Sequence, residues 1–274
     1  MRAPSPVEEA AFRALCRKVE RERGFYCSSY KDSCLRRRFA VRMRLSRAPS
    51  FQAYAHVLDS DATEYEQLMT ALTINVSKFF RNPETFSCIA ARVLPELWRL
   101  TSGEIRIWSA GCASGEEPYS IAALCCETAR SRGATAASRF SICASDVDEE
   151  ALAVAEAGLF PPSAFVDVTP AVIDRYFPLI EECHAVASDV RTLTSFHRQD
   201  LLEHGWPFER VHLILCRNVI IYLKREAQEW LMNRFHELLL PGGFLVLGKV
   251  ETLLGETREL FAPVSSRERV YRRA

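Results

Sequence analysis

Strand-like and helix-like segments alternate from about residue 105 onward, and this alternation constrains the fold more than any other feature of the sequence. The run IRIWSA (105–110) is followed by a glycine-containing turn and then by a helical stretch from Pro118 to Arg130. The same order recurs at FSICASD (140–146), which precedes a helical stretch from Glu149 to Ala157. Strands that alternate with helices predict a mostly parallel, doubly wound sheet that is covered on both faces.

The remainder of this region adds further elements to the predicted sheet. A helical stripe from Lys224 to Leu240 is expected to stop at Pro241-Gly242-Gly243. Segment 158–190 fits the alternation poorly, and we interpret it as an insertion on the rim of the sheet. The other strand candidates are residues 192–200, 211–218, 244–250 and 269–273.

The first 80 residues or so have a different, purely helical pattern. One helical face starts near Val7, and further stretches run from Lys31 to Arg47, from Ser50 to Ser60 and from Thr63 to Leu72. The second of these is strongly basic, since Asp32 is its one acidic residue. Its arginines are Arg36, Arg37, Arg38, Arg42, Arg44 and Arg47.

Composition and cysteine usage exclude several classes of protein. Lys+Arg and Asp+Glu both number 35, so the overall charge names no partner. The sequence starts without a signal-peptide pattern, and no stretch approaches the roughly 20 apolar residues of a membrane helix. The ten cysteines form no C-x-x-C pair. We therefore expect a reduced cytoplasmic protein with neither a metal nor a membrane-inserted segment.

The turn after the first strand, Gly111 to Pro118, is a candidate ligand-binding loop. It lacks the G-x-G-x-x-G spacing of dinucleotide-binding loops and the GK[ST] of a P-loop. Glu116 and Glu117 would repel a phosphate but suit a ligand that carries an ammonium group or a ribose. The loop therefore favours the cationic S-adenosylmethionine, and the alternative is an ordinary capped turn between a strand and a helix.

Polar residues also follow the other predicted strands, where ligands bind in such sheets. Asp146 could accept the hydroxyl groups of a ribose, or it could cap the next helix, as Asp148 could. Asp200 could accept a hydrogen bond from an adenine amino group, or it could be a loop acid near His204. Asn218 ends an apolar strand and is hard to explain as a core residue, and Tyr222 follows four residues later.

The junction between the two patterns is Thr73 to Pro83. Asn82 and Pro83 have the pattern of a helix N-cap with proline at the first helical position. In an interpretation in which these residues only serve the fold, Phe79 and Phe80 would pack between two domains, and Arg81 would be a surface charge.

Four blocks of this sequence, in this order and spacing, resemble the CheR family of chemotaxis-receptor protein-glutamate O-methyltransferases. The blocks are LTINVSKFFRNPETF, IWSAGCASGEEPYSIA, ASDVDEEALAVAEAGLF and LILCRNVIIYL…RFHELLLPGGFLVLG. The resemblance implies a helical domain (1–72), a linker (73–85) and a Rossmann-like methyltransferase domain (86–274). It also implies methyl transfer from S-adenosylmethionine to glutamates on the cytoplasmic helices of chemotaxis receptors, with S-adenosylhomocysteine as the product.

The resemblance also assigns site residues. Asp146 would bind the ribose, Glu116 would lie near the methionine or ribose moiety, and Arg81 and Tyr222 would be catalytic and face the transferable methyl group. The full set that the resemblance implies for the cofactor is Asn75, Ser77, Arg81, Glu116, Asp146, Asp200, Leu201, Asn218 and Val219.

Several positions depart from the family pattern. Ser77 replaces a common threonine, Asp200 replaces a common asparagine, and Gly248 to Glu251 replaces a small residue followed by His-Ser-Glu. Some family members grip a receptor tether peptide with a β-subdomain, whereas the corresponding segment here, about 176–192, looks short and lacks the glycine-rich hairpin of that subdomain. The sequence leaves open whether a tether peptide is bound.

The chemistry implied by the resemblance needs no general base, because a glutamate carboxylate is already ionised at neutral pH. Positioning of that carboxylate would supply the catalysis. The basic segment would hold an acidic receptor helix through Arg37, Arg38 and Arg42, or else form a solvated helix face. The competing interpretations are a methyltransferase for a small molecule or nucleic acid and a regulatory module that only senses the cofactor. We expect a monomer that does not bind nucleic acid.

Overall fold

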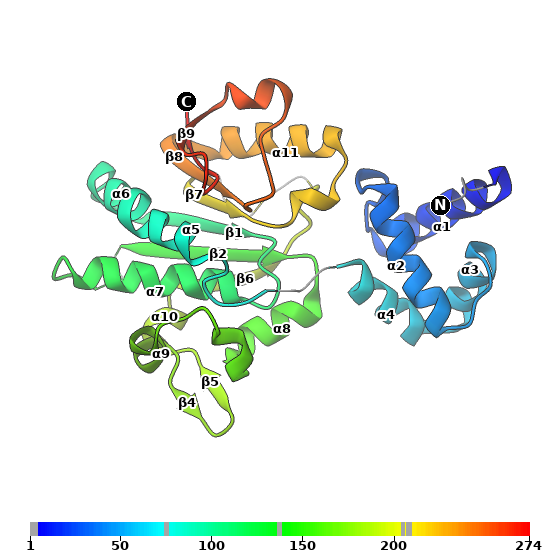
Figure 1. The fold of residues 1–274 in the computed structure, drawn as a ribbon, viewed down its shortest axis with the longest axis horizontal. Helices are drawn as coiled ribbons and strands as arrows, with labels where there is room; N and C mark the ends of the chain where they lie inside the picture. Colours follow the sequence, from blue (N-terminus) through cyan, green and yellow to red (C-terminus); the bar gives the residue numbers. More distant parts are fainter. Residues whose placement is uncertain (1–4, 74–76, 136–138, 204–205, 207–209) are drawn as a thin grey trace. The chain divides into compact units, whose positions relative to one another are not determined.

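The computed structural model describes residues 5–73, 77–135, 139–203, 206 and 210–274. By their contacts, these residues form two compact units (Figure 1). Unit 1 contains the chain up to residue 73 together with Tyr222–Ala227, and unit 2 contains the rest. A short piece of the later sequence therefore folds with the N-terminal helices.

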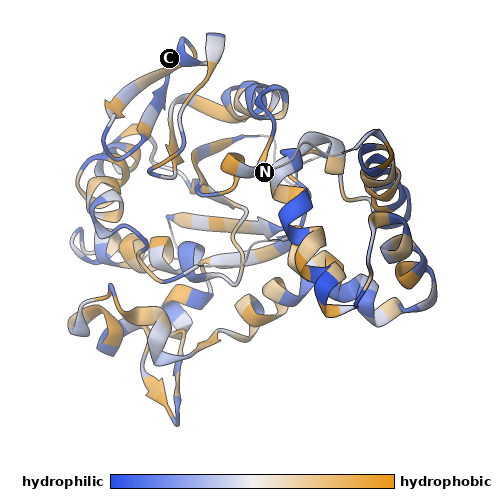
Figure 2. Ribbon diagram, turned by 45° about the vertical axis from the view of Figure 1, so that its right-hand side comes forward, coloured by the Kyte–Doolittle hydropathy of each residue, from blue (hydrophilic) through white to orange (hydrophobic). Residues whose placement is uncertain are grey.

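Unit 1 is all-helical, and the sequence pattern predicts its helices closely. The elements are α1 (Pro6–Arg23), η1 (Cys27–Ser29), α2 (Asp32–Leu45), α3 (Phe51–Ser60) and α4 (Ala62–Leu72). Ser50 caps α3 by accepting a hydrogen bond from the main-chain nitrogen of Ala53 at 3.1 Å, and Asp61 caps α4 in the same way. In Figure 2 the helices carry both hydrophobic and hydrophilic residues, as expected where each helix buries one face.

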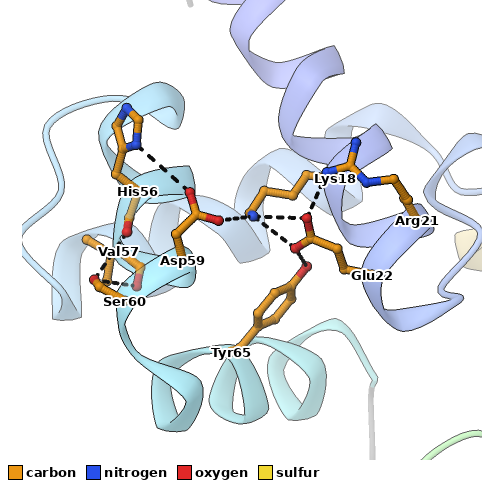
Figure 3. Close-up of polar contacts among 8 residues, drawn as sticks. All are labelled: Lys18, Arg21, Glu22, His56, Val57, Asp59, Ser60 and Tyr65. Atoms are coloured by element: carbon orange, nitrogen blue, oxygen red, sulfur yellow. Dashed lines mark hydrogen bonds and ion pairs between the residues drawn. The ribbon is translucent and has the colours of Figure 1, made fainter.

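Aromatic packing and a cluster of ion pairs hold the helices of unit 1 together. The rings of Phe12 and Phe51 lie 5.5 Å apart between centroids, and both residues are buried. Figure 3 shows Lys18 of α1 between Glu22, at 2.8 Å, and Asp59 of α3. The hydroxyl of Tyr65, from α4, donates to Glu22 at 3.1 Å. One charged cluster thus links α1, α3 and α4.

Unit 2 is built on a sheet whose described strands number seven, in the order β6-β2-β1-β7-β8-β10-β9. The neighbouring strands β6, β2, β1, β7 and β8 run parallel to one another, whereas β10 is antiparallel to both of its neighbours, β8 and β9. This arrangement confirms the predicted α/β fold with a mostly parallel sheet. The strands are β1 (Ile105–Ala110), β2 (Phe140–Asp146), β6 (Thr194–Arg198), β7 (Val211–Cys216), β8 (Leu239–Leu247), β9 (Phe261–Ser265) and β10 (Val270–Arg273).

Helices cover both faces of this sheet. Ser109 of β1 hydrogen-bonds Glu117 of α7, whereas the neighbouring Trp108 packs its ring against Phe235 of α11, so α7 and α11 lie on opposite faces (Figure 1). The helical elements of unit 2 are α5 (Pro83–Cys88), η2 (Ile89–Val93), α6 (Leu94–Leu100), α7 (Glu116–Arg130), α8 (Glu149–Ala157), η4 (Pro162–Phe165), α9 (Pro170–Tyr176), α10 (Ser188–Arg191), η5 (Ile220–Tyr222), α11 (Arg225–Leu238) and η6 (Gly255–Arg258). The first residues of α11 and the last of η5 belong to unit 1 by their contacts.

The structure corrects two predicted boundaries and fills the poorly fitting segment. Helix α11 ends at Leu238 because β8 begins at Leu239, and Pro241-Gly242-Gly243 lies inside that strand, where the register with β7 shifts. Helix α7 starts at Glu116 rather than Pro118. Segment 158–190 includes a second, antiparallel sheet of β3 (Leu159–Phe160), β5 (Cys183–Ala185) and β4 (Leu179–Ile180).

Candidate functional site

Four parallel strands, β6, β2, β1 and β7, end at the same edge of the sheet. The chain proceeds from β1 to β2 and β6 on one side and then returns to β7 on the other side, so β1 and β7 flank a topological switch point. Ligands bind at the carboxyl ends of the strands at such a point. The residues that follow these four strands are therefore the candidate site.

The loop after β1 is held against the end of β2. The main-chain nitrogens of Gly111 and Cys112 donate to the carbonyl oxygen of Ser145 at 2.8 and 3.0 Å. Gly111 has a positive φ of 77°, and a Cβ added there would lie 2.5 Å from Cγ2 of Val219. Only glycine fits this position, because the loop packs directly on the residue that follows Asn218.

Asp146 closes this loop and does not cap the following helix. Its carboxylate accepts hydrogen bonds from the main-chain nitrogens of Ala113, at 2.8 Å, and Asp148, at 3.0 Å. Asp148, not Asp146, caps α8 by accepting from Ala151 at 3.0 Å. Desolvation by the surrounding protein raises the pKa of Asp146 above its ordinary range, although the two N–H groups oppose that shift.

Asp200 lies beside Asp146 at the neighbouring strand end. Its Oδ1 accepts from the main-chain nitrogen of Leu202 at 2.9 Å, and Gln199 donates its main-chain N–H to the carbonyl of Asp146 at 2.9 Å. Burial raises the pKa of Asp200 to about 6, and the negative charges of Glu203 and Asp146 add to this effect. Leu201 is buried, and His204, the alternative partner of Asp200, lies outside the described residues.

We expect cofactor affinity to depend on pH through Asp200. If the ionised carboxylate of Asp200 accepts a hydrogen bond from the cofactor, the affinity for the cofactor is highest when the pH is above the pKa of about 6. The affinity then falls as the pH drops through that value, because the carboxylate becomes protonated. Binding should then be roughly tenfold weaker at about pH 5 than at about pH 7. Calorimetric titration measures this dependence. Asp200→Asn is the matched control, and an equally steep profile in that variant would assign the titration to another group.

Glu116 contributes an unsatisfied oxygen at the start of α7. The residue is 7% exposed, and its Oε2 is buried without a hydrogen-bond partner in the described part of the chain. Burial raises the pKa of Glu116, whereas a hydrogen bond from the side chain of Ser77 lowers it. The structure thus brings the side chains of Ser77 and Glu116 together. Asn75 lies outside the described residues.

Asn218 is held in an unusual conformation by Glu251. Asn218 has a positive φ of 63°, and its main-chain nitrogen donates to Oε2 of Glu251 at 2.9 Å. The same carboxylate accepts from Gly248 at 2.6 Å and from Ile221 at 3.3 Å. A Cβ at Gly248 would lie 2.7 Å from Oε2 of Glu251, which explains the glycine at that position. Among the described residues, Oδ1 of Asn218 is buried without a partner.

These groups fit the cofactor that the sequence suggests. Oε2 of Glu116 and Oδ1 of Asn218 are buried acceptors that no described residue satisfies, and such atoms are costly unless a ligand or water donates to them. Asp146 and Asp200 add two carboxylates at adjacent strand ends. A set of acceptor oxygens, with no cation among these four residues, suits a ligand whose ammonium, hydroxyls and exocyclic amine donate hydrogen bonds.

The linker before α5 belongs to the core of unit 2, which corrects the interdomain packing considered for its phenylalanines. The ring of Phe79 stacks on Phe165 at 4.2 Å between centroids, and Phe80 packs on Phe86 at 5.2 Å. Asn82 occupies the N-cap position of α5, but its side chain makes no capping hydrogen bond. Instead, its Oδ1 accepts from Arg217 at 3.1 Å.

Tyr222 lies at the end of η5 and makes its contacts in unit 1. The guanidinium of Arg38 lies over its ring, 5.2 Å from the centroid, and its carbonyl oxygen accepts from the main-chain nitrogen of Lys31 at 2.9 Å. Its catalytic role stays a prediction, as does that of Arg81.

The sequence did not single out Arg217 or Glu251 as site residues. Both are buried charged residues that bind the main chain next to predicted site residues, and their partners are distant in sequence. The available signals were weak: Arg217 is a basic residue directly after an apolar strand, and Glu251 appeared only as part of a departure from the family pattern.

Comparison with protein families and curated proteins shows which proteins this chain is similar to. Residues 75–270 match the family model described as CheR methyltransferase, SAM binding domain, and residues 10–73 match the CheR methyltransferase, all-alpha domain. The chain is 31% identical to a chemotaxis protein methyltransferase of Salmonella typhimurium, over 92% of this chain and 87% of that protein.

This chain covers very different shares of two further relatives. A chemotaxis protein methyltransferase of Escherichia coli is 31% identical over 89% of this chain and 85% of its own length. An uncharacterized 104.1 kDa protein of Rhodobacter capsulatus is 32% identical over 88% of this chain, but the chain spans 25% of that protein.

Proposed function

Because the chain belongs to the CheR methyltransferase family, we propose that it transfers methyl groups from S-adenosylmethionine to glutamate side chains of chemotaxis receptors. When bound, the cofactor supplies an electrophilic methyl group on a sulfonium. The products would be glutamate methyl esters and S-adenosylhomocysteine. The relatives named chemotaxis protein methyltransferase support the class of acceptor.

The single observation that carries this proposal is the set of acceptors at the switch point. Asp146 is fixed by two main-chain N–H groups and can accept from the ribose hydroxyls. Asp200 and Leu201 follow the next strand and would flank the adenine. Glu116 and Asn218 each present a buried oxygen that lacks a partner among the described residues, and these oxygens can hold the cationic methionine moiety.

Arg81 would hold the acceptor glutamate. A carboxylate is the nucleophile in its ionised form, so the protein needs to position it and need not remove a proton. A guanidinium binds a carboxylate through two parallel hydrogen bonds, which fixes both its distance and its orientation. The resemblance assigns Tyr222 a role at the reacting methyl group, and this assignment is part of the proposal.

The basic helix α2 would attract the receptor, but not through all three arginines predicted from the sequence. Arg42 binds Glu64 through Nε at 3.0 Å and through Nη2, so this guanidinium is engaged inside unit 1. Arg38 is buried over the ring of Tyr222. Arg37 is exposed, as are Arg44 and Arg47. The arginine charge available to an acidic helix therefore comes from Arg37 and Arg44 on α2 and from Arg47 just after it.

We expect Arg37→Glu/Arg44→Glu to lower receptor methylation about tenfold at low salt, because rim charges mainly set the rate of encounter with a charged partner. The difference from wild type should shrink as salt is added. Arg17→Glu/Arg99→Glu is a control with the same change in net charge at exposed positions outside α2. Equal losses of methylation rate in both double variants would show that the basic face of α2 has no specific role in binding the receptor.

The proposed function is tested by incubating the protein with radiolabelled S-adenosylmethionine and a purified cytoplasmic fragment of a chemotaxis receptor. Label that enters the fragment and is released by mild base is expected, since carboxyl methyl esters are base-labile. Base-stable label would indicate a different acceptor group. Cofactor binding without transfer to any fragment tried would favour a regulatory module.

A further inference from the structure

Arg217 is a buried cation that binds the linker. Its side chain is 2% exposed, and Nη1 lies 3.1 Å from Oε2 of Glu117. Nη2 donates to the carbonyl oxygen of Arg81 at 2.6 Å and to Oδ1 of Asn82 at 3.1 Å. Its guanidinium also lies over the ring of Phe86, 5.2 Å from the centroid. One guanidinium, on the residue that follows β7, therefore contacts both helix α7 and the linker.

The main chain on both sides of Arg81 adopts conformations that require such support. Phe80 has a φ of 52° and Asn82 a φ of 65°, and left-handed backbone is unfavourable for a bulky residue such as phenylalanine. Phe80 is held by its main-chain N–H, which donates to the hydroxyl of Ser120 at 2.9 Å. Arg217 holds the other side. The two contacts fix the position of the Arg81 Cα between them.

The ion pair is itself anchored to the sheet. Glu117 accepts a hydrogen bond from the hydroxyl of Ser109, on β1, at 2.8 Å. The Nη atoms of this buried arginine reach one carboxylate, one main-chain carbonyl and one side-chain amide oxygen, whereas its Nε has no hydrogen-bond partner among the described residues. Removal of Glu117 would leave a desolvated, unpaired charge, which is strongly unfavourable. The contacts from Ser109 to Glu117 and from Glu117 to Arg217 thus attach the linker to the ends of the parallel strands β1 and β7.

We propose that Arg217 is a positioning residue that sets the location of Arg81, the residue that the proposed function assigns to the acceptor carboxylate. Arg217 acts through the carbonyl of Arg81 and the side chain of Asn82, and it does not contact the substrate. Misplacement of a catalytic group by about 1 Å costs on the order of 10²-fold in rate. A positioning contact of this kind therefore has a measurable effect on turnover.

The test is a double-mutant cycle with Arg217→Lys and Arg81→Ala. Lysine keeps the charge beside Glu117 but lacks the fork that reaches Glu117 and the carbonyl of Arg81 together. In the wild-type background we expect Arg217→Lys to lower kcat about 10- to 30-fold while the cofactor Kd changes less than about twofold. In the Arg81→Ala background the same substitution should have almost no further effect. Equal losses in both backgrounds would overturn the proposal, since they would mean that Arg217 acts independently of Arg81.

Asn82→Gly is the second variant, and it keeps the proposal testable if Arg217→Lys folds poorly. Glycine accepts the positive φ of Asn82 but removes the side-chain acceptor of Arg217. A fall in kcat of about threefold that disappears in the Arg81→Ala background supports the proposal. A kcat identical to that of wild type contradicts it. Arg99→Lys, at an exposed position, controls for the substitution itself.

Hydrogen exchange separates this inference from the proposed function. In the protein without cofactor, we expect amides of residues 79–82 to exchange faster in Arg217→Lys than in wild type, whereas those of strand β1 should not change. Unchanged exchange of residues 79–82 would show that Arg217 does not hold the linker in place, even if the enzyme is active. Absence of methyl transfer in the wild-type protein, with the exchange difference present, would count against the proposed function and not against the contact.

Discussion

Arg81→Ala is expected to lower kcat for receptor methylation by roughly 10²–10³-fold while the protein stays folded. The substitution removes a bidentate, charge-assisted contact at the reacting centre, and losing such a group typically costs on the order of 2–4 kcal/mol of barrier. The fold should survive because the linker is held by main-chain contacts of its neighbours and by the carbonyl of Arg81, all of which alanine retains. Single-turnover and steady-state rates of methyl transfer measure the effect.

Arg81→Lys is the matched variant for this prediction. Lysine keeps the positive charge but loses the planar fork, so it should restore activity only in part. Cofactor affinity and melting temperature, recorded for each variant, show whether a lost rate reflects catalysis or folding. If a folded Arg81→Ala protein has a kcat within about threefold of wild type, a difference of only ~0.7 kcal/mol in the barrier, Arg81 is not catalytic.

Asp146→Ala should weaken binding of S-adenosylmethionine and S-adenosylhomocysteine about 100-fold. A carboxylate that accepts from two ribose hydroxyls makes two hydrogen bonds to a charged acceptor, each of about 1.5–3 kcal/mol, and part of this is offset by relief of its desolvation. The substitution also releases the main-chain nitrogen of Ala113 from its acceptor, which should loosen the loop after β1. Calorimetric titration of both ligands measures the affinity.

Asp148→Ala provides the control for Asp146. Asp148 caps α8 two residues away and lies outside the predicted cofactor contacts, so alanine there should lower stability by about 1 kcal/mol and leave affinity nearly unchanged. If Asp146→Ala binds the cofactor as tightly as wild type, Asp146 is not part of the site. If both variants lose affinity equally, the loss reflects the fold of the loop.

Local sequence patterns predicted the elements that position the site. The runs at 105–110 and 140–146 became β1 and β2 with the same bounds, because continuous β-rich runs bounded by turn residues have few alternatives. The helical stretches expected in the first 80 residues also became helices of unit 1. Since the ends of parallel neighbouring strands meet at one edge, the placement of Asp146 and Asp200 side by side followed from the fold.

Tertiary pairings could not be predicted in the same way. Arg42 was grouped with the other arginines of α2, but its partner Glu64 lies 22 residues away on α4, and periodicity contains no information about such a pair. Arg217 and the carbonyl of Arg81 are separated by 136 residues. The strand β9 and the small sheet of β3, β4 and β5 were missed because short strands on the rim lack a distinctive pattern.

The most direct test of the central claim is to locate the methyl groups on the acceptor. A receptor cytoplasmic fragment is incubated with S-adenosylmethionine and the wild-type protein, digested at mildly acidic pH to preserve esters, and analysed by tandem mass spectrometry, with Arg81→Ala as the control. The account predicts methyl esters on glutamate side chains of the fragment's helices with wild type, and almost none with Arg81→Ala. Methyl groups found only on other atoms, or none on any fragment while the protein binds the cofactor, would contradict it.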